Sequence, residues 1–298
     1  MGVGYSCVDM ICMVEDFPVE DSSTHITSRV VQGGGAVATA LVAASRLGTK
    51  CAFIGNIGND IMSYETIRMF QSDGVCTDYM VRRDDCYGLE SIVMINPANG
   101  SRTKFPQRDY NPPISWDDRL VSVIGGCNVL HLDGTHYENA VNAARIAKEH
   151  GVLVSLDGCS MQKDNEKNKI LATMADILIM NSKYPLKVSG KATYDEALLE
   201  MSTWGSKKVV GCTLGDNGSK FVVGGRVVDF PSFKAKSVVD TTGCGDVFHG
   251  AFLSAYVSGM ALEKCIRFAS ATACCKCAVP GGRAGIPNRD VVLGIIGE

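Results

Sequence analysis

The sequence predicts an α/β protein of three layers, in which helices cover both faces of a mainly parallel sheet, together with a small antiparallel sheet. Short apolar segments alternate with helical segments through most of the 298 residues, which is typical of parallel strands buried on both faces. Two segments, 11–32 and 87–105, instead alternate polar and apolar residues without helical periodicity, which indicates strands of a second sheet. The length suits one large domain.

The core is predicted from short apolar strands and the helices between them. Residues 60–73 and 136–150 are predicted helices, and Ala140, Ala144 and Ala147 share one face of the second. The predicted strands are residues 3–8, 50–54, 127–132, 152–156, 177–180 and 208–213.

The second sheet is predicted to be inserted in this core. Residues 91–96 and 101–105 flank an Asn99-Gly100 pair, which is typical of a tight hairpin turn. We therefore assign residues 11–32 and 87–105 to the inserted sheet, and residues 1–10, 33–86 and 106–298 to the core.

Composition excludes several classes of partner. A net charge of −3 argues against nucleic acid or an anionic membrane. No apolar run approaches the ~20 residues that a membrane span needs, and the five His form no cluster that would predict a metal cage. Thirteen Cys is an odd number, and many of them lie in apolar runs, which indicates reduced, buried thiols in a cytoplasmic protein.

The segment 240–252, DTTGCGDVFHGAF, carries the strongest chemical signal. Apolar residues recur at helical spacing from Val247 onward, so a helix is predicted to begin near Gly245. Glycines allow close approach of a ligand, and the free N–H groups at a helix start form an anion site. Asp246 beside that site suits proton removal from a hydroxyl while a phosphoryl group is transferred. The alternative is an ordinary first-turn acid.

This segment resembles the C-terminal signature of the ribokinase-like (PfkB-type) carbohydrate kinases. The N-terminal signature of that family has a counterpart about two hundred residues earlier, in the segment GGGAVATA at 33–40. The likeness covers the whole chain, through GGRAGIP at 281–287. It implies a ribokinase-like fold and ATP-dependent phosphorylation of a primary hydroxyl of a small sugar or sugar derivative, with Mg²⁺. It also implies that the second sheet is a lid over the sugar and a homodimer surface.

The resemblance assigns roles to individual residues. Asp246 is the general base, and the backbone amides of Gly243, Cys244 and Gly245 form the anion hole; a thiol at a helix N-terminus such as Cys244 is also expected to have a lowered pKa. Asp9, directly after the first predicted strand, is expected to bind sugar hydroxyls together with Gly33, Gly34 and Asp133. Capping of a turn is the alternative for both acids.

The nucleotide is expected at neighbouring strand ends. Asn181 matches the first residue of an N-x-x-E motif of the family, and 213–218 matches T-x-G-x-x-G, for which a plain hairpin turn is the alternative. The expected ATP-binding residues are Asn181, Thr213, Gly215, Gly218 and Thr242. Many family members also hold a monovalent cation on backbone carbonyls, here near Asp240, Thr242, Gly281 and Gly285, and dependence on K⁺ is left open.

Some positions depart from the family pattern. Ala38 stands where Asn is usual, and Tyr184 where Glu is usual, but the branch that resembles sulfofructose kinases lacks the same two residues. Ser23 and Thr135 replace the sulfonate-binding residues of that branch, so a sulfonate substrate is not predicted. The lid cations Arg102, Lys104 and Arg108 can bind an acidic group on the acceptor or be solvated charges.

Three other functions stay open from the sequence. These are a nucleoside kinase of the same fold, a sugar-binding regulator without catalysis, and an NAD(P)-dependent oxidoreductase. The last rests on Gly33-x-Gly35-x-x-Ala38, which fits a dinucleotide fingerprint. However, no acid follows at the end of the next strand until Asp60, and a dinucleotide site normally has one.

Overall fold

The computed structural model describes residues 1–96, 102–235 and 237–297. A ten-stranded central sheet has the order β14-β13-β12-β11-β10-β9-β1-β4-β5, with β6 paired to β4. From β12 to β5 and β6 the strands are parallel, and β13 and β14 add an antiparallel hairpin at one edge. The strands are β1 Gly2–Val3, β4 Cys51–Ile57, β5 Val75–Cys76, β6 Met80–Arg82, β9 Val129–Leu132, β10 Leu153–Gly158, β11 Ile177–Asn181, β12 Val209–Thr213, β13 Ser219–Val223 and β14 Arg226–Phe230.

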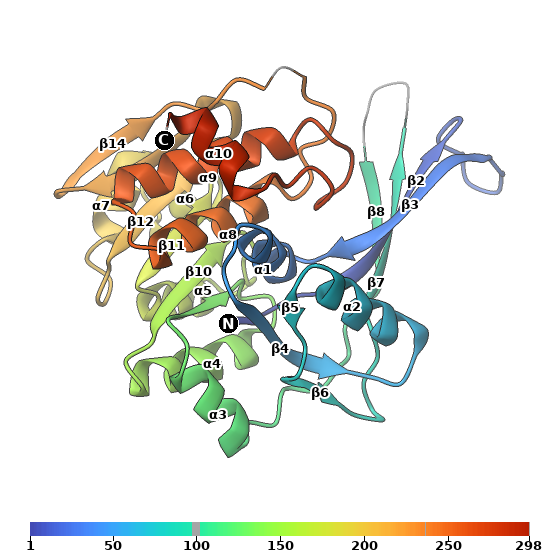
Figure 1. Cartoon of the computed structure of the whole chain (residues 1–298), viewed down its shortest axis with the longest axis horizontal. Coiled ribbons are helices and arrows are strands. Elements are labelled where there is room, and N and C mark those ends of the chain that lie inside the picture. Colours follow the sequence, from blue (N-terminus) through green and yellow to red (C-terminus); the bar gives the residue numbers. More distant parts are fainter. Residues whose placement is uncertain (97–101, 236, 298) are drawn as a thin grey trace.

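Helices cover both faces of this sheet, so the predicted three-layer fold is confirmed (Figure 1). Alternate residues of one strand point to opposite layers: Ile177 and Ile179 pack with Phe252 of α8, whereas Leu178 packs with Ala143 of α4. The helices are α1 Ala36–Arg46, α2 Ile61–Ser72, α3 Asp118–Gly125, α4 Tyr137–Glu149, α5 Asn165–Met174, α6 Tyr184–Ser189, α7 Tyr194–Met201, α8 Cys244–Val257, α9 Leu262–Lys276 and α10 Arg289–Ile296. None of the described helices is long and apolar enough to cross a membrane.

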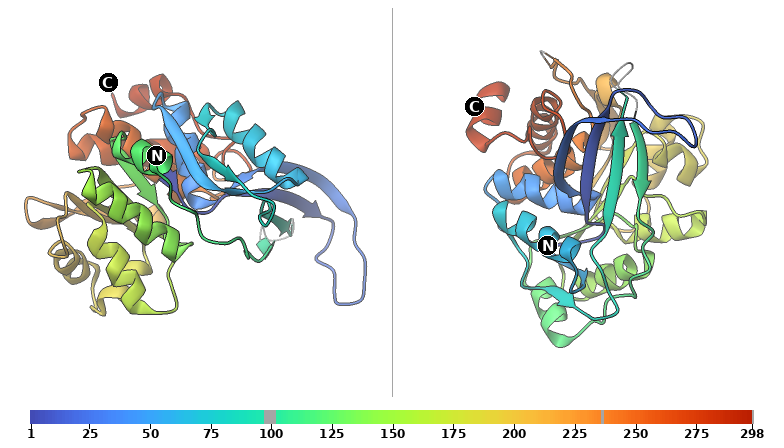
Figure 2. Two further views of the ribbon diagram at one scale, coloured as in Figure 1. Left: turned by 90° about the horizontal axis from the view of Figure 1, so that it is seen from below. Right: turned by 90° about the vertical axis from the view of Figure 1, so that its right-hand side faces the viewer.

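A second sheet, which we call the lid, projects from one side of the core (Figures 1 and 2). Its order is β3-β2-β7-β8, with β2 Cys7–Val14, β3 Ile26–Gly34, β7 Glu90–Ile95 and β8 Arg102–Pro106. The β2–β3 and β7–β8 pairs are antiparallel, and the central β2–β7 pair is parallel because two hairpins lie side by side. The predicted Asn99-Gly100 turn lies outside the described residues.

The chain enters the lid earlier than the sequence predicts. The expected first strand, 3–8, is divided: β1 ends at Val3 in the core, and β2 begins at Cys7 in the lid. The bend uses Gly4, where a Cβ would come 2.6 Å from Val37 and 2.7 Å from the Asp133 carboxylate. Asp9 therefore lies inside a lid strand, and not at the end of a core strand as expected.

Candidate active site

The DTTGCGD segment forms a turn and a helix start, as predicted. Gly243 is the N-cap of α8 in a left-handed conformation (φ 75°), which glycine adopts without strain. A Cβ there would also come 2.8 Å from the carbonyl oxygen of Gly282. Asp246 lies in the first turn of α8, where the helix N–H groups lack intrahelical acceptors. A negatively charged group is therefore favoured at this position.

The glycines at 33–35 connect the end of β3 to the start of α1. Gly33 and Gly34 lie against the side chains of Arg283 and Asp9. A Cβ at Gly33 would come 1.9 Å from the Arg283 guanidinium, and one at Gly34 would come 2.2 Å from the Asp9 carboxylate. Gly35 precedes α1 with φ 95°. The sequence predicted that a ligand approaches these glycines closely. In the structure, the side chains of Asp9 and Arg283 also pack against Gly34 and Gly33 at the end of β3.

The two motifs share one cavity. Helices α1 and α8 pack against each other, and their N-terminal ends border a cavity of about 400 Å³. The expected sugar and catalytic residues that line it are Asp9, Gly33, Gly34, Gly243 and Asp246. Arg102 and Lys104 of β8 also line it, so these lid cations are part of the site. We call this space the acceptor cavity.

The Asp246 carboxyl group has the electrostatics of a general base. Burial raises its pKa to about 7, and the nearby negative charge of Asp157 acts in the same direction. No hydrogen bond to this carboxylate is found within the described part of the chain. A base with a pKa near neutrality is efficient, because it is substantially deprotonated yet still binds a proton strongly.

The other two acids expected to bind sugar have different environments. Burial raises the pKa of Asp9, and its Oδ1 accepts a hydrogen bond from the Cys7 thiol at 3.3 Å. Asp133 does not line the acceptor cavity; it is fully buried and accepts from the backbone N–H groups of Tyr5, Thr135 and Val37 at 2.8, 2.9 and 3.4 Å. It holds the bend at Gly4 against the start of α1, and its expected sugar contact stays a prediction.

A second cavity, of about 270 Å³, lies on the other side of the α8 N-terminus. Thr213, Gly215 and Gly218 line it together with Cys244 and Gly245. The short 3-10 helix η1 Gly215–Asn217 forms part of its rim. Thr241 lines both cavities, so the two are adjacent at the start of α8. Three of the five residues expected to bind ATP line this second cavity. We call this space the nucleotide cavity.

Two expected nucleotide residues lie elsewhere. Asn181 pairs in register with Thr213, but its side chain accepts from the N–H groups of Lys183 and Tyr184 at 3.0 and 3.1 Å and so holds the turn that leads into α6. It does not line the nucleotide cavity, and Thr242 lines the acceptor cavity instead. The Thr242 hydroxyl accepts a hydrogen bond from Arg102, which joins the lid to the core.

The residues that depart from the family pattern belong to the core. Tyr184 is 2% exposed and donates its hydroxyl to the carbonyl of Asn168 at 3.1 Å, and Ala38 is fully buried. Neither lines a cavity described above. Burial raises the pKa of the Cys244 thiol, which lies 3.0 Å from the sulfur of Cys277. The low thiol pKa expected from its helix position is therefore wrong, because burial disfavours the charged thiolate and the hydrogen bond with Cys277 also raises the pKa.

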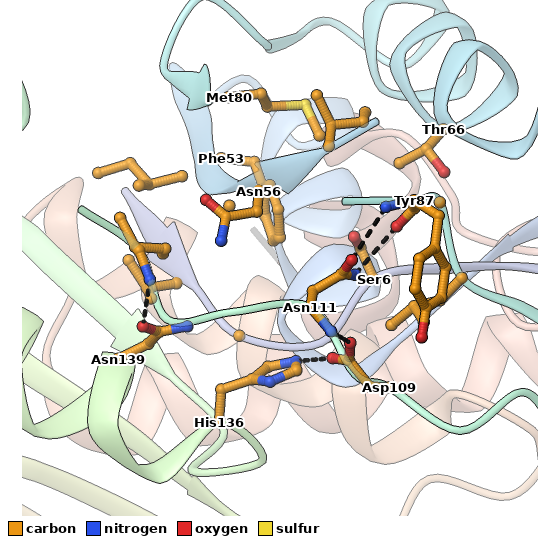
Figure 3. A pocket seen from close by; sticks show the side chains of 18 of the residues that line it. Ser6, Phe53, Asn56, Thr66, Met80, Tyr87, Asp109, Asn111, His136 and Asn139 are labelled. Atoms are coloured by element: carbon orange, nitrogen blue, oxygen red, sulfur yellow. Dashed lines mark hydrogen bonds and ion pairs between the residues drawn. The ribbon is translucent and has the colours of Figure 1, made fainter. Parts of the chain in front are cut away.

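A third, small cavity of about 50 Å³ lies where the lid strands return to the core (Figure 3). Asp109 pairs with His136 at 3.2 Å, and the Asn111 side chain bonds both the N–H and the carbonyl of Tyr87 at 2.9 and 3.0 Å. Asn139 accepts from the N–H of Ile114. The cavity is too small for a sugar, and its polar side chains anchor the two lid connections.

Sequence reasoning missed the two buried cations beside the site. Arg283 donates to the carbonyl of Gly34 at 3.0 Å and is 5% exposed. Lys276 is fully buried and donates to the carbonyl of Asp240 at 2.8 Å. The one available signal in the sequence was that each of these cations lies within a segment of small residues. Lys and Arg are rarely fully buried unless they have a partner, so burial was not predicted for them.

Comparison with known proteins identifies the family. Residues 1–289 match the family described as pfkB family carbohydrate kinase. The chain belongs to this family. The PfkB family membership and the kinase activity predicted from the sequence are therefore confirmed. The likeness to the sulfofructose kinase-like branch stays a prediction.

Several PfkB relatives align over most of this chain. It is 28% identical to a bifunctional ribokinase/ribose-5-phosphate isomerase A of Fructilactobacillus sanfranciscensis, covering 99% of this chain but only 56% of that protein. It is 26% identical to the deoxyribokinase of Salmonella typhi over 90% of each chain. The structure of Arabidopsis thaliana ribokinase complexed with ribose and ATP superposes with a TM-score of 0.85 at 25% identity, covering 99% and 97% of the two chains. Since relatives also include a nucleoside kinase, the comparisons identify a sugar or nucleoside kinase.

Proposed function

We propose that this PfkB kinase transfers the γ-phosphoryl group of ATP to a primary hydroxyl of a small sugar or sugar derivative. The observation that carries the proposal is the acceptor cavity, in which Asp246 lies beside the N-terminal amides of α8 and beneath the lid cations. A ribokinase of the same fold has been seen with ribose and ATP. Tyr5 is the one aromatic residue among the described residues that line this cavity, which favours a sugar over a nucleoside base that would need stacking.

The residues of the two cavities have different roles in the proposed reaction. Asp9 and the backbone of Gly33 and Gly34 orient the sugar, and Asp246 accepts the proton of the attacking hydroxyl. The amides of Gly243–Gly245 stabilise the charge on the transferring phosphoryl group. ATP lies in the nucleotide cavity near Thr213.

Mg²⁺ would neutralise the phosphate oxygens when it is bound with ATP. No group of three acidic, His or Cys side chains suited to a metal ion occurs among the described residues. This fits a Mg²⁺ ion held chiefly by phosphates and water, as is usual in kinases.

The direct test is an ADP-release screen of ketoses, aldoses, polyols, sugar acids and nucleosides with MgATP. We expect turnover with one or more small sugars and little with nucleosides. Turnover restricted to nucleosides would reassign the acceptor cavity to a nucleoside. Sugar binding without ADP release from any acceptor would remove the catalytic role.

The activity is expected to depend on the protonation of Asp246. Because the carboxylate form accepts the proton and its pKa is about 7, kcat/KM should fall as pH decreases through 7, by about tenfold per unit at lower pH. The measurement is a pH profile of kcat/KM with saturating MgATP. A profile that stays flat down to pH 5 is incompatible with this assignment.

We also propose that the lid forms a homodimer surface. Three of its large apolar side chains, Val31, Ile92 and Phe105, are 43%, 38% and 54% exposed, and with Met10 they form one row across the four strands on one face of the sheet. Contiguous exposed apolar residues mark interaction surfaces. Sedimentation equilibrium is expected to give twice the chain mass, and Val31→Lys to shift the protein toward the monomer. A monomeric wild-type protein at micromolar concentration rules the dimer out.

A further inference from the structure

A completely buried lysine lies beneath the catalytic turn. Lys276 is in the last turn of α9, has no exposed surface, and donates from Nζ to the carbonyl oxygen of Asp240 at 2.8 Å. Lysine is almost never fully buried, because removing its charge from water is costly unless other groups compensate. Its position therefore needs a reason beyond packing.

The surroundings of Nζ connect it to the anion site. Asp240 begins the turn that leads to Gly243, and its carboxylate accepts from the N–H groups of Thr242 and Gly281, both at 2.8 Å. The carbonyl of Cys277, next to Lys276, accepts from the N–H groups of Val239 and Asp240 at 2.8 and 3.1 Å. The end of α9 therefore bonds both backbone groups of Asp240, its carbonyl oxygen through Lys276 and its N–H through Cys277. The ammonium group also lies at the C-terminal end of α9, where a positive charge is favoured by the helix dipole.

This arrangement disagrees with the monovalent cation that the family resemblance implies. That ion was expected on backbone carbonyls near Asp240, Thr242, Gly281 and Gly285. Here the Asp240 carbonyl already accepts from an ammonium group. Gly285 is packed so closely on Lys276 that a Cβ there would come 2.6 Å from the Lys276 carbonyl oxygen. A second cation beside a fixed, buried ammonium would be repelled, so the residues present do not fit one.

We propose that Lys276 is a built-in cation that takes the place of the monovalent ion. It fixes the Asp240–Thr242 turn and, through it, the amides at the start of α8. Lys276 touches neither expected substrate cavity, so it is a positioning residue. The inference rests on the proposed kinase reaction, and its consequence is that the protein needs no K⁺.

The first experiment uses the wild-type protein. Turnover and melting temperature are measured in potassium, sodium and N-methyl-D-glucamine chlorides at equal ionic strength. We expect both quantities to be the same in all three salts. A saturable increase of either one with K⁺ would overturn the proposal, and the melting measurement decides this even if no acceptor sugar has been found.

The second experiment uses variants of the lysine. Lys276→Met keeps the length of the side chain and removes its charge, and we expect kcat to fall about 10–100-fold with a smaller change in KM, as for other outer positioning groups. Lys276→Ala leaves space, so ammonium or potassium chloride should restore part of kcat and raise the melting temperature saturably. The exposed Lys163→Met is the matched control and should behave as wild type.

The outcomes separate positioning from simple packing. Full kcat in Lys276→Met, or a folded Lys276→Ala protein that responds to neither cation, would show that the charge has no such role. If both variants fail to fold, the salt comparison on the wild-type protein still gives the answer. If no kinase activity exists at all, the cation-dependent melting of Lys276→Ala tests the site separately from the reaction.

Discussion

Replacement of Asp246 by Asn is expected to lower kcat by about 10²–10⁴-fold while the sugar still binds. The amide keeps the size of the side chain and its place in the first turn of α8, but it cannot accept the proton of the attacking hydroxyl. The anion hole of Gly243–Gly245 stays intact, so binding of ATP should change little. The measurements are steady-state turnover by ADP release and sugar affinity by calorimetry.

A matched control separates catalysis from the ordinary effect of an acid at a helix start. Asp290 is an exposed acid in the first turn of α10, and Asp290→Asn should leave kcat unchanged. Both variants lose one favourable interaction with a helix dipole, worth about 0.3–1 kcal/mol. If Asp246→Asn retained near-normal turnover, Asp246 would be only such a first-turn acid, and the base would have to be sought elsewhere in the acceptor cavity.

Local sequence patterns predicted most of the fold and the start of α8. The apolar strands at 177–180 and 208–213 match β11 and β12 closely, because buried parallel strands carry their signal within a few residues. The start of α8 was equally local, since the small residues and Asp246 lie in one turn. Such features depend on neighbours in sequence.

The sequence could not predict features that depend on distant parts of the chain. Asp9 looked like the end of a core strand, because the bend at Gly4 is needed only where the chain meets Val37 and Asp133. The role of Asp133 in holding this bend was not predicted, because its backbone partners lie up to 128 residues away. Lys276 gave only the weak signal of a charge within a small-residue segment, because its partner, the Asp240 carbonyl, is a backbone group that every residue has.

Replacement of Gly250 by Val is expected to destabilise the protein strongly. Gly250 lies within α8 where the helix meets α1, and a Cβ there would come 2.0 Å from the Ala40 carbonyl oxygen and 2.8 Å from Ala43. Backbone cannot yield as a flexible side chain does, so we expect a loss of about 3 kcal/mol or more in the free energy of unfolding. Thermal unfolding should show a melting temperature lower by about 6–12 °C.

The close α1–α8 contact also sets the distance between the two glycine motifs, since α1 starts after Gly33–Gly35 and α8 after Gly243. Any Gly250→Val protein that remains folded should therefore lose both sugar affinity and turnover, although residue 250 lines neither the acceptor nor the nucleotide cavity. Gly294→Ala in α10 is the matched control: no atom lies within 4 Å of its Cβ position, and it should stabilise the helix by about 0.5–1 kcal/mol. An unchanged melting temperature in Gly250→Val would mean that the two helices do not approach so closely, and the shared acceptor cavity would lose its structural basis.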